Sequence, residues 1–206
     1  MSQKRVGILI FPDVEVLDFC GPFEVFSVTR LNESKGREEP SPFEVLLVAE
    51  SLEAISTIGG MRVLPNRTLR TCPPIDILLV PGGWGTRQEM SNPRLIAWVK
   101  KRTQQVELLA SVCTGALILG STGLLDGRTA TTHWKSLDLM SQRFPSVKVD
   151  RRRHVVVDGR IITSAGISAG IDLALHIVQH YFGKRAAHAT ARHMEYSFTK
   201  NNRRRV

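Results

Sequence analysis

Cys113 lies in the stretch LLASVCTGALILGSTG, residues 108–123, where a run of apolar residues gives way to Thr-Gly-Ala and a helix-like segment. Its neighbours Ser111 and Gly115 are small, as a nucleophile elbow requires, because the tight strand-to-helix turn leaves no room for bulky side chains. The N-terminus of the following helix would favour a thiolate, the reactive form of cysteine. We therefore expect Cys113 to be a nucleophile and the most reactive thiol of the chain; the alternative is a small buried apolar residue.

A cysteine nucleophile also needs hydrogen-bond donors for the negative charge that develops on its substrate. The backbone N–H of Thr114 follows the nucleophile directly. A second donor could come from Gly82 or Gly83 in LLVPGGWG, because glycines after a strand let the backbone approach a ligand closely. Thr114 and Gly83 are our candidate oxyanion donors, unless the glycines only form an ordinary turn.

Proton transfer requires an acid or a base, and the segment EVLDFCGPFEVF offers Asp18 and Glu24 shortly after the first apolar run. A carboxyl group beside a thiol would share a proton with it, and a raised pKa would suit general acid–base catalysis. Either acid could instead cap a helix or face solvent. His133 in ATTHWKS is the nearest histidine after the elbow, so a Cys-His dyad is also conceivable. Glu24 and His133 are accessory candidates beside Asp18.

The elements that must position these residues alternate along the chain. Apolar runs predict strands at residues 5–11, 43–49, 75–83 and 106–112. Short extended pieces are expected at residues 61–65, 154–158 and 160–166. Helical patterns follow at residues 92–105, 115–123, 133–144, 167–183 and 184–198, with an earlier helix entered around Pro22. Asn92 is expected to cap one helix and Gly183 to end another. This alternation predicts an α/β fold with a doubly wound, mostly parallel sheet, helices on both faces, and ligands at the carboxyl ends of the strands.

The length of 206 residues and the hydrophobic fraction of 42% predict one globular domain that spans residues 1–206. Three cysteines without paired spacing predict free thiols. His176 and His180 would share a helix face, but the Glu of an HExxH zinc motif is missing between them, so we expect no metal. The first residues lack the pattern of a signal peptide and no apolar run is long enough to span a bilayer, which predicts a cytoplasmic protein.

The formal net charge of +9 would suit an anionic partner such as nucleic acid. Much of the excess lies in two short clusters, DRRRH at residues 150–154 and the basic C-terminal tail at residues 196–206. Charge runs of this kind are usually solvated turns or frayed tails. We therefore expect no nucleic-acid partner and a tail incidental to the chemistry, so that deletion of the last four residues should leave turnover intact.

Four segments in order carry a resemblance to a known family. They are VGILIFPDVEVLDFCGPFEVF, DILLVPGGWG, LLASVCTGALILGSTGLLDGRTATTHW and GRIITSAGISAGIDLALHIVQHYFG. Together they resemble the ThiJ/PfpI superfamily, which is class I glutamine amidotransferase-like, and within it the branch that holds isonitrile hydratases and the sensor domains of AraC-type regulators. The resemblance implies a flavodoxin-like fold, a homodimer, a nucleophile at Cys113, a carboxylic partner at Asp18, and oxyanion donors from Gly83 and Thr114.

Departures from the wider family refine this interpretation. Many hydrolase-like and glyoxalase-like members carry a histidine directly after the nucleophile, whereas this chain has Thr114, as isonitrile hydratases do. The few residues after ARHMEY leave no room for a helix-turn-helix domain, so we expect no DNA binding by that route. The same residues lack the proline-rich segment that usually follows in the hydratases, which leaves the exact substrate open.

The first hypothesis is a cysteine-dependent enzyme of isonitrile hydratase type, a carbon–nitrogen lyase that acts on a small molecule without a cofactor. Cys113 would attack the isocyanide carbon, Asp18 would deliver a proton to give a thioimidate, and water would release an N-substituted formamide. The alternatives are a non-catalytic module that senses redox state or a ligand, and a glyoxalase-like or deglycating enzyme in which His133 shuttles protons.

Overall fold

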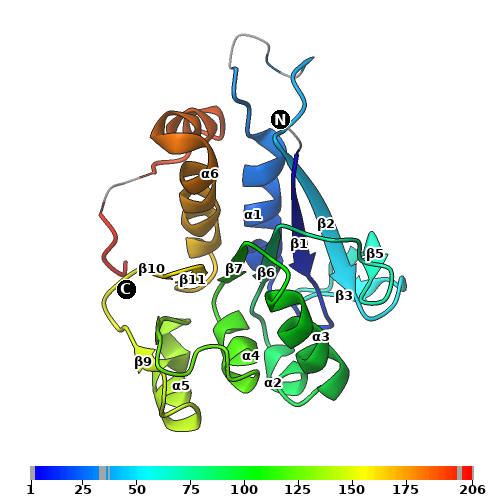
Figure 1. The fold of residues 1–206 in the computed structure, drawn as a ribbon, viewed down its shortest axis with the longest axis vertical. Coiled ribbons are helices and arrows are strands. Elements are labelled where there is room, and N and C mark those ends of the chain that lie inside the picture. Colours follow the sequence, from blue (N-terminus) through cyan, green and yellow to red (C-terminus); the bar gives the residue numbers. More distant parts are fainter. Residues whose placement is uncertain (1–2, 33–35, 37, 199–200, 206) are drawn as a thin grey trace.

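A seven-stranded sheet forms the centre of the fold (Figure 1), in the order β10-β11-β7-β6-β1-β2-β5. The computed structural model describes residues 3–32, 36, 38–198 and 201–205. The strands are β1 (Lys4–Leu9), β2 (Phe43–Ala49), β5 (Arg67–Thr68), β6 (Ile77–Val80), β7 (Leu108–Ser111), β10 (Val155–Asp158) and β11 (Ile161–Ser164). Every residue of β6 and β7 is buried, as continuous apolar runs predict for central strands.

All neighbouring strands of this sheet pair in parallel except β10 and β11, which form an antiparallel hairpin. The register aligns Ile77 of β6 with Val6 of β1 and with Leu108 of β7. The carboxyl ends of β1, β6, β7 and β11 therefore meet at one edge of the sheet. The predicted α/β fold with a mostly parallel sheet is confirmed.

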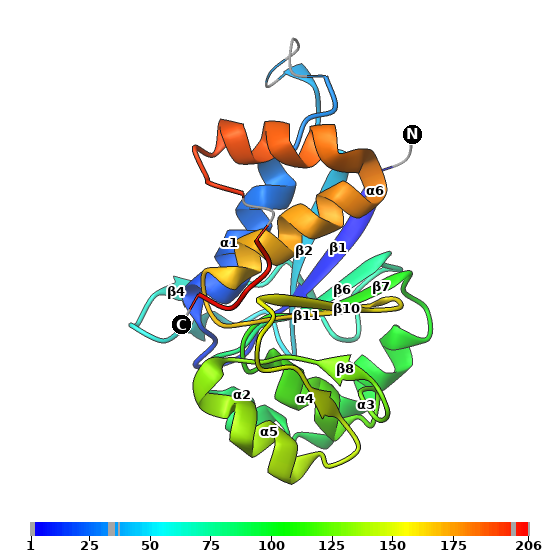
Figure 2. The ribbon, with the colours of Figure 1, turned by 90° about the vertical axis from the view of Figure 1, so that its left-hand side faces the viewer.

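Helices cover both faces of the sheet (Figure 2). On one face, α1 (Val16–Val28) packs against the long α6 (Ala169–His193). On the other lie α2 (Thr86–Glu89), α3 (Pro93–Thr103), α4 (Gly115–Ser121) and α5 (Leu137–Arg143). The remaining elements are two-stranded pairs, β3 (Ile55–Ser56) with β4 (Arg62–Val63) and β8 (Thr129–Ala130) with β9 (Lys148–Val149), and a 3₁₀ turn, η2 (Trp134–Ser136). No helix in the described ranges is both long and apolar enough to cross a membrane.

Three helix boundaries test the predictions from capping residues. Asn92 caps α3 by accepting hydrogen bonds from the next backbone N–H groups, with Pro93 at the first helical position, as predicted. Gly183 interrupts α6 with φ 83° and ψ 170°, which confirms the predicted break between two helices. The predicted entry at Pro22 is wrong, because α1 begins at Val16 and holds Pro22 in its interior. Asp18 consequently lies in the first turn of this helix.

Residues 201–205, which we name the C-terminal strap, correct the expectation of a frayed basic tail. Asn202 accepts the backbone N–H of His154 at 2.8 Å, and its side chain exchanges two hydrogen bonds of 2.8 Å with the backbone of Val155. Arg205 forms a 3.0 Å ion pair with the buried Asp172. Backbone pairing and a buried counter-ion hold the strap against the hairpin of β10 and β11. Residues 199, 200 and 206 of the predicted tail lie outside the described residues.

Candidate active site

Cys113 occupies the strand-to-helix corner between β7 and α4, and its backbone φ is 56°. A non-glycine residue with positive φ is uncommon and often marks a functional turn. The surrounding chain fixes this conformation, because the Cys113 N–H donates to the carbonyl of Ala165 at 3.1 Å and its carbonyl accepts the Thr132 hydroxyl at 2.8 Å. The side chain is 6% exposed. The turn therefore has the backbone geometry of an elbow, with the sulfur in a nearly dry site.

Asp18 lies beside Cys113, with its carboxyl group completely buried. One oxygen, Oδ2, accepts the backbone N–H of Gly82 at 2.9 Å. The other, Oδ1, has no partner at hydrogen-bond geometry among the described residues, although the Cys113 thiol and the backbone N–H of Ile167 are both close enough to influence the pKa of the carboxyl. A buried carboxyl oxygen without a partner is costly when ionised, and it is therefore a suitable place for a proton.

Burial decides the protonation of this pair. Desolvation raises the pKa of Asp18 from 3.8 to about 8, and the negative charge of Glu15 adds to the rise. Desolvation also raises the pKa of the Cys113 thiol, and an ionised Asp18 would raise it further, while the Thr114 N–H lowers it. The expectation that the helix N-terminus favours a thiolate is wrong in this respect, because the loss of hydration outweighs the nearby N–H group. Near pH 7 the acid is mainly protonated.

Cys113 is still predicted to be the most reactive thiol, but the reason is now the neighbouring carboxyl group and not the helix N-terminus. Burial raises the pKa of all three thiols, but among the described residues only Cys113 has a carboxyl group beside it, and the ionised fraction of Asp18, which grows as the pH approaches 8, can take up the thiol proton as the sulfur reacts. We expect substoichiometric iodoacetamide to label Cys113 first and Cys20 and Cys72 later, as measured by peptide mapping. Preferential labelling of Cys72, which is equally buried but has no such carboxyl group, would contradict the assignment.

The turn after β6 holds its glycines too close to the site for any side chain. A Cβ on Gly82 would lie 2.6 Å from the Thr114 backbone nitrogen, so only glycine fits there. The N–H of Gly83 donates to the Thr114 hydroxyl at 3.0 Å, so the predicted oxyanion donor at Gly83 already has an acceptor. We correct that assignment, because Gly83 orients Thr114 in this arrangement. The Thr114 N–H faces the sulfur instead.

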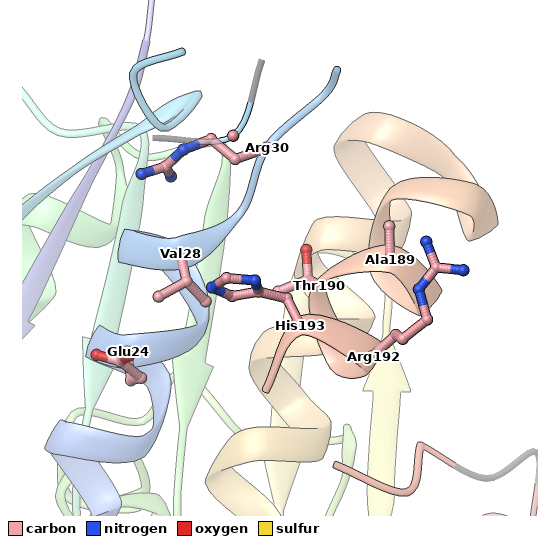
Figure 3. Close-up of a pocket in the computed structure, with 8 residues that line it drawn as sticks. Glu24, Val28, Arg30, Ala189, Thr190, Arg192 and His193 are labelled. Atoms are coloured by element: carbon pink, nitrogen blue, oxygen red, sulfur yellow. The ribbon is translucent and has the colours of Figure 1, made fainter. Parts of the chain in front are cut away.

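Glu24 is not part of this site. It is exposed on α1 and lines a cavity of about 470 Å³ with residues from the C-terminal part of α6, among them Thr190 and His193 (Figure 3). Figure 3 shows these side chains between α1 and the C-terminal part of α6. The proposed accessory role of Glu24 is therefore wrong, since six residues of helix separate it from the carboxyl that does approach Cys113.

His133 lies near the site without a hydrogen bond to Cys113 among the described residues. Its Nδ1 accepts the backbone N–H of Lys135 at 3.3 Å, and its ring packs against Gly166, where a Cβ would lie 2.2 Å away. Desolvation and the positive charges of Lys135 and Arg204 lower the pKa of His133. The imidazole is therefore mainly neutral near pH 7 and does not provide a cation for a thiolate.

One backbone group at the site was not identified from the sequence. Ile167, with φ 53°, approaches Asp18 through its N–H. Gly82 was a candidate donor for the substrate, but its N–H donates to the carboxyl of Asp18. The small residues of SAGISAG after β11 were the available signal, because such residues permit a tight turn near a ligand. In the part of the chain that the structure describes, no group of three or more His, Cys, Asp or Glu residues could hold a metal ion.

Comparisons with known proteins found a matching family model and several relatives. The model of the DJ-1/PfpI family matches residues 4–180. An isonitrile hydratase of Pseudomonas putida is 34% identical over 193 residues, which cover 94% of this chain and 78% of the hydratase. The HTH-type transcriptional regulator GbdR of Pseudomonas aeruginosa is 28% identical, covering 97% of this chain and 53% of the regulator. The crystal structure of a ThiJ/PfpI family protein from Pseudomonas syringae superposes with a TM-score of 0.84 at 30% identity, covering 96% of this chain and 76% of that one.

Proposed function

The chain belongs to the DJ-1/PfpI family, and from that membership we propose that it is a cysteine-dependent enzyme that hydrates a small isonitrile to an N-substituted formamide. The observation that carries the proposal is the buried pair of Cys113 and Asp18, in which the carboxyl group has a pKa of about 8. The similarity to the hydratase of Pseudomonas putida supports the same reaction.

Isonitrile hydration needs a nucleophile for the terminal carbon and a proton for that same carbon. In the proposed first step, the sulfur of Cys113 forms a bond to the isocyanide carbon while Asp18 gives its proton to that carbon. The thiol proton then passes to the carboxylate, so Asp18 ends this step protonated again. The product is a thioimidate, Cys–S–CH=N–R. Because the acid is regenerated, a resting pair that is neutral at pH 7 can act without prior formation of a thiolate.

Water completes the reaction. It adds across the C=N bond of the thioimidate, with its hydroxyl on carbon and its proton on nitrogen, and the carbon becomes tetrahedral. The C–S bond then breaks, the hydroxyl proton returns to sulfur through Asp18, and the formamide leaves. One isonitrile and one water give one formamide, and the protein is unchanged. The backbone N–H of Thr114, whose hydrogen bond lowers the pKa of Cys113, would stabilise the negative charge that develops on the substrate in both steps.

The test is turnover of alkyl isonitriles by the purified protein, followed by formamide formation, with methylglyoxal and small amides as competing substrates. Turnover of isonitriles alone supports the hydratase. Turnover of methylglyoxal without any isonitrile activity would move the assignment to a glyoxalase-like enzyme.

The pH profile of kcat/KM provides a separate prediction. Because Asp18 must be protonated to deliver its proton, we expect the rate to be highest below about pH 8 and to fall as the pH rises through that value. A carboxyl with an ordinary pKa would already be ionised at pH 5 and would leave no such descending limb. The measurement is kcat/KM for one isonitrile between pH 5 and 10, with melting temperatures at each pH as a control for folding. A rate that rises steadily through pH 8 would contradict Asp18 as the acid.

A sensor module is the second candidate, and the similarity to GbdR, a transcriptional regulator, is what favours it. A sensor would bind an isonitrile or an oxidant at Cys113 without turnover. We further propose that the protein is located in the cytoplasm and that it is a homodimer. The family resemblance implies the homodimer, and light scattering on the purified protein tests it.

A further inference from the structure

A small cavity of about 180 Å³ lies against the turn that follows β11. It is lined by Ala165, Gly166, Ile167, Ser168, His133, Trp134, His154, Arg204 and Arg205. Cys113 and Asp18 do not line the cavity, but they contact the backbone of two residues that do: the carbonyl of Ala165 accepts the Cys113 N–H, and the N–H of Ile167 approaches Asp18. The volume of the cavity suits a ligand of only a few heavy atoms.

Arg204, from the C-terminal strap, carries an incompletely paired charge on this cavity. Its Nη2 donates to the Thr131 hydroxyl at 2.5 Å and to the Thr132 carbonyl at 3.0 Å, and its Nε donates to the Arg151 carbonyl at 3.2 Å. These neutral acceptors fix the plane of the guanidinium. The remaining nitrogen, Nη1, is buried and has no hydrogen-bond partner within the described residues.

The carboxylate of Asp150 is near enough to raise the pKa of Arg204, but no carboxylate of the described residues forms an ion pair with Arg204, whereas the neighbouring Arg205 is paired with Asp172. Desolvation lowers the pKa of Arg204, but arginine stays protonated, so a partly buried positive charge remains. Burying a charge and two N–H donors without an anionic partner is unfavourable. An anionic ligand would supply the negative charge and the hydrogen-bond acceptor that Nη1 of Arg204 lacks among the described residues.

We propose that this cavity is an anion subsite, in which Nη1 of Arg204 binds the carboxylate of a small substrate whose reactive carbon points to Cys113. The inference rests on the proposed function for the reacting group, and it limits the substrate to a small isonitrile that carries an acidic group. It replaces the expectation that the C-terminal tail is incidental to the chemistry, because deletion of the last four residues would remove Arg204 and should lower turnover of such a substrate. Thr132 connects Arg204 to the nucleophile. Its carbonyl accepts a hydrogen bond from Arg204, and its hydroxyl donates one to the carbonyl of Cys113.

Alkylation of Cys113 tests the subsite without any assumption about turnover. Iodoacetate and iodoacetamide present the same carbon to sulfur, which forms a C–S bond as iodide leaves, but only iodoacetate carries a carboxylate. We expect the rate ratio of iodoacetate to iodoacetamide at Cys113 to exceed the ratio at Cys20 in the same protein by about 10-fold or more, the usual effect of one charge-assisted hydrogen bond. Arg204→Gln should reduce the Cys113 ratio to that of Cys20.

Two variants separate charge from packing. Arg203→Gln removes the same charge from an exposed side chain of the strap and should leave the ratio unchanged. Arg204→Lys keeps the charge and should retain much of the ratio. Equal ratios at Cys113 and Cys20 in the wild type would overturn the subsite. Loss of the ratio in both Arg204→Gln and Arg204→Lys would also overturn it, because the effect would then come from packing of the strap.

The matched substrates isocyanoacetate and methyl isocyanoacetate connect the subsite to turnover. The two share the isocyanide and differ in the carboxylate, so we expect the acid to have about 10-fold higher kcat/KM and Arg204→Gln to remove this difference. Turnover of neither compound, with the alkylation preference retained, would reject the hydratase and keep the subsite. Equal turnover of both, without an alkylation preference, would reject the subsite and keep the hydratase.

Discussion

Cys113→Ala is expected to abolish isonitrile turnover, with a loss of at least about 10⁴-fold, because no other nucleophile stands at the elbow and the thioimidate cannot form without sulfur. The measurement is formamide formation under saturating isonitrile, with mass spectrometry of the intact protein to detect the covalent adduct. The wild type should accumulate the adduct when quenched in acid, and Cys113→Ala should not.

Cys72→Ala is the matched control, since it removes an equally buried sulfur away from the site. It should retain turnover, and its melting temperature reports the cost of a small buried cavity. Residual turnover in Cys113→Ala within about 10-fold of the wild type would reject covalent catalysis by this residue.

Asp18→Asn is expected to lower kcat/KM by about 100- to 10,000-fold, because an amide of similar shape cannot exchange a proton with carbon or sulfur. The double variant with Cys113→Ala should be no worse than Cys113→Ala alone, since residues that share one step have strongly non-additive effects. His133→Ala should be milder than Asp18→Asn. A larger loss in His133→Ala would instead support the Cys-His dyad, and wild-type rates in Asp18→Asn would exclude Asp18 as the proton carrier.

The same substitution should stabilise the protein near neutral pH. The folded state keeps Asp18 protonated up to about pH 8, whereas the unfolded chain releases this proton near pH 3.8. Between these values the folded state binds one more proton, so the wild type loses roughly 1 kcal/mol of unfolding free energy for each unit of rising pH. Asp18→Asn lacks this dependence. Its advantage in urea denaturation should therefore grow from pH 4 to pH 8, and an advantage that shrinks would contradict a protonated Asp18.

Much of the fold follows from local patterns in the sequence. Continuous apolar runs identified β2 and β7, and the residues Asn92 and Gly183 marked helix boundaries through hydrogen bonding and backbone freedom that need no tertiary partner. Pro22 was expected at the entry of a helix, but it lies inside α1, where its ring packs closely against Gly170 of α6. Such long-range contacts leave no periodic signal.

The sequence predicted those parts of the site that depend on the type of a side chain or on a tight turn between two elements. Cys113 and Asp18 were found from their places after strands, and the burial that raises their pKa values was not, since burial comes from the surrounding elements. Gly83 and Glu24 were misassigned because the sequence does not say which acceptor an N–H meets or which side of a helix faces the sheet. Arg204 lay in a charge run, where composition alone favours solvent.

The C-terminal strap also bears on how the sheet behaves at high concentration. β10 is an edge strand, and open edges offer unpaired N–H and C=O groups to strands of other molecules. Asn202 already occupies the backbone groups of Val155 and the N–H of His154 at the start of this strand, while the opposite edge, β5, is only two residues long. Few unpaired backbone groups at the edges of the sheet are therefore available for pairing with strands of other molecules. We expect release of the C-terminal strap to promote aggregation while the core of the protein is still folded.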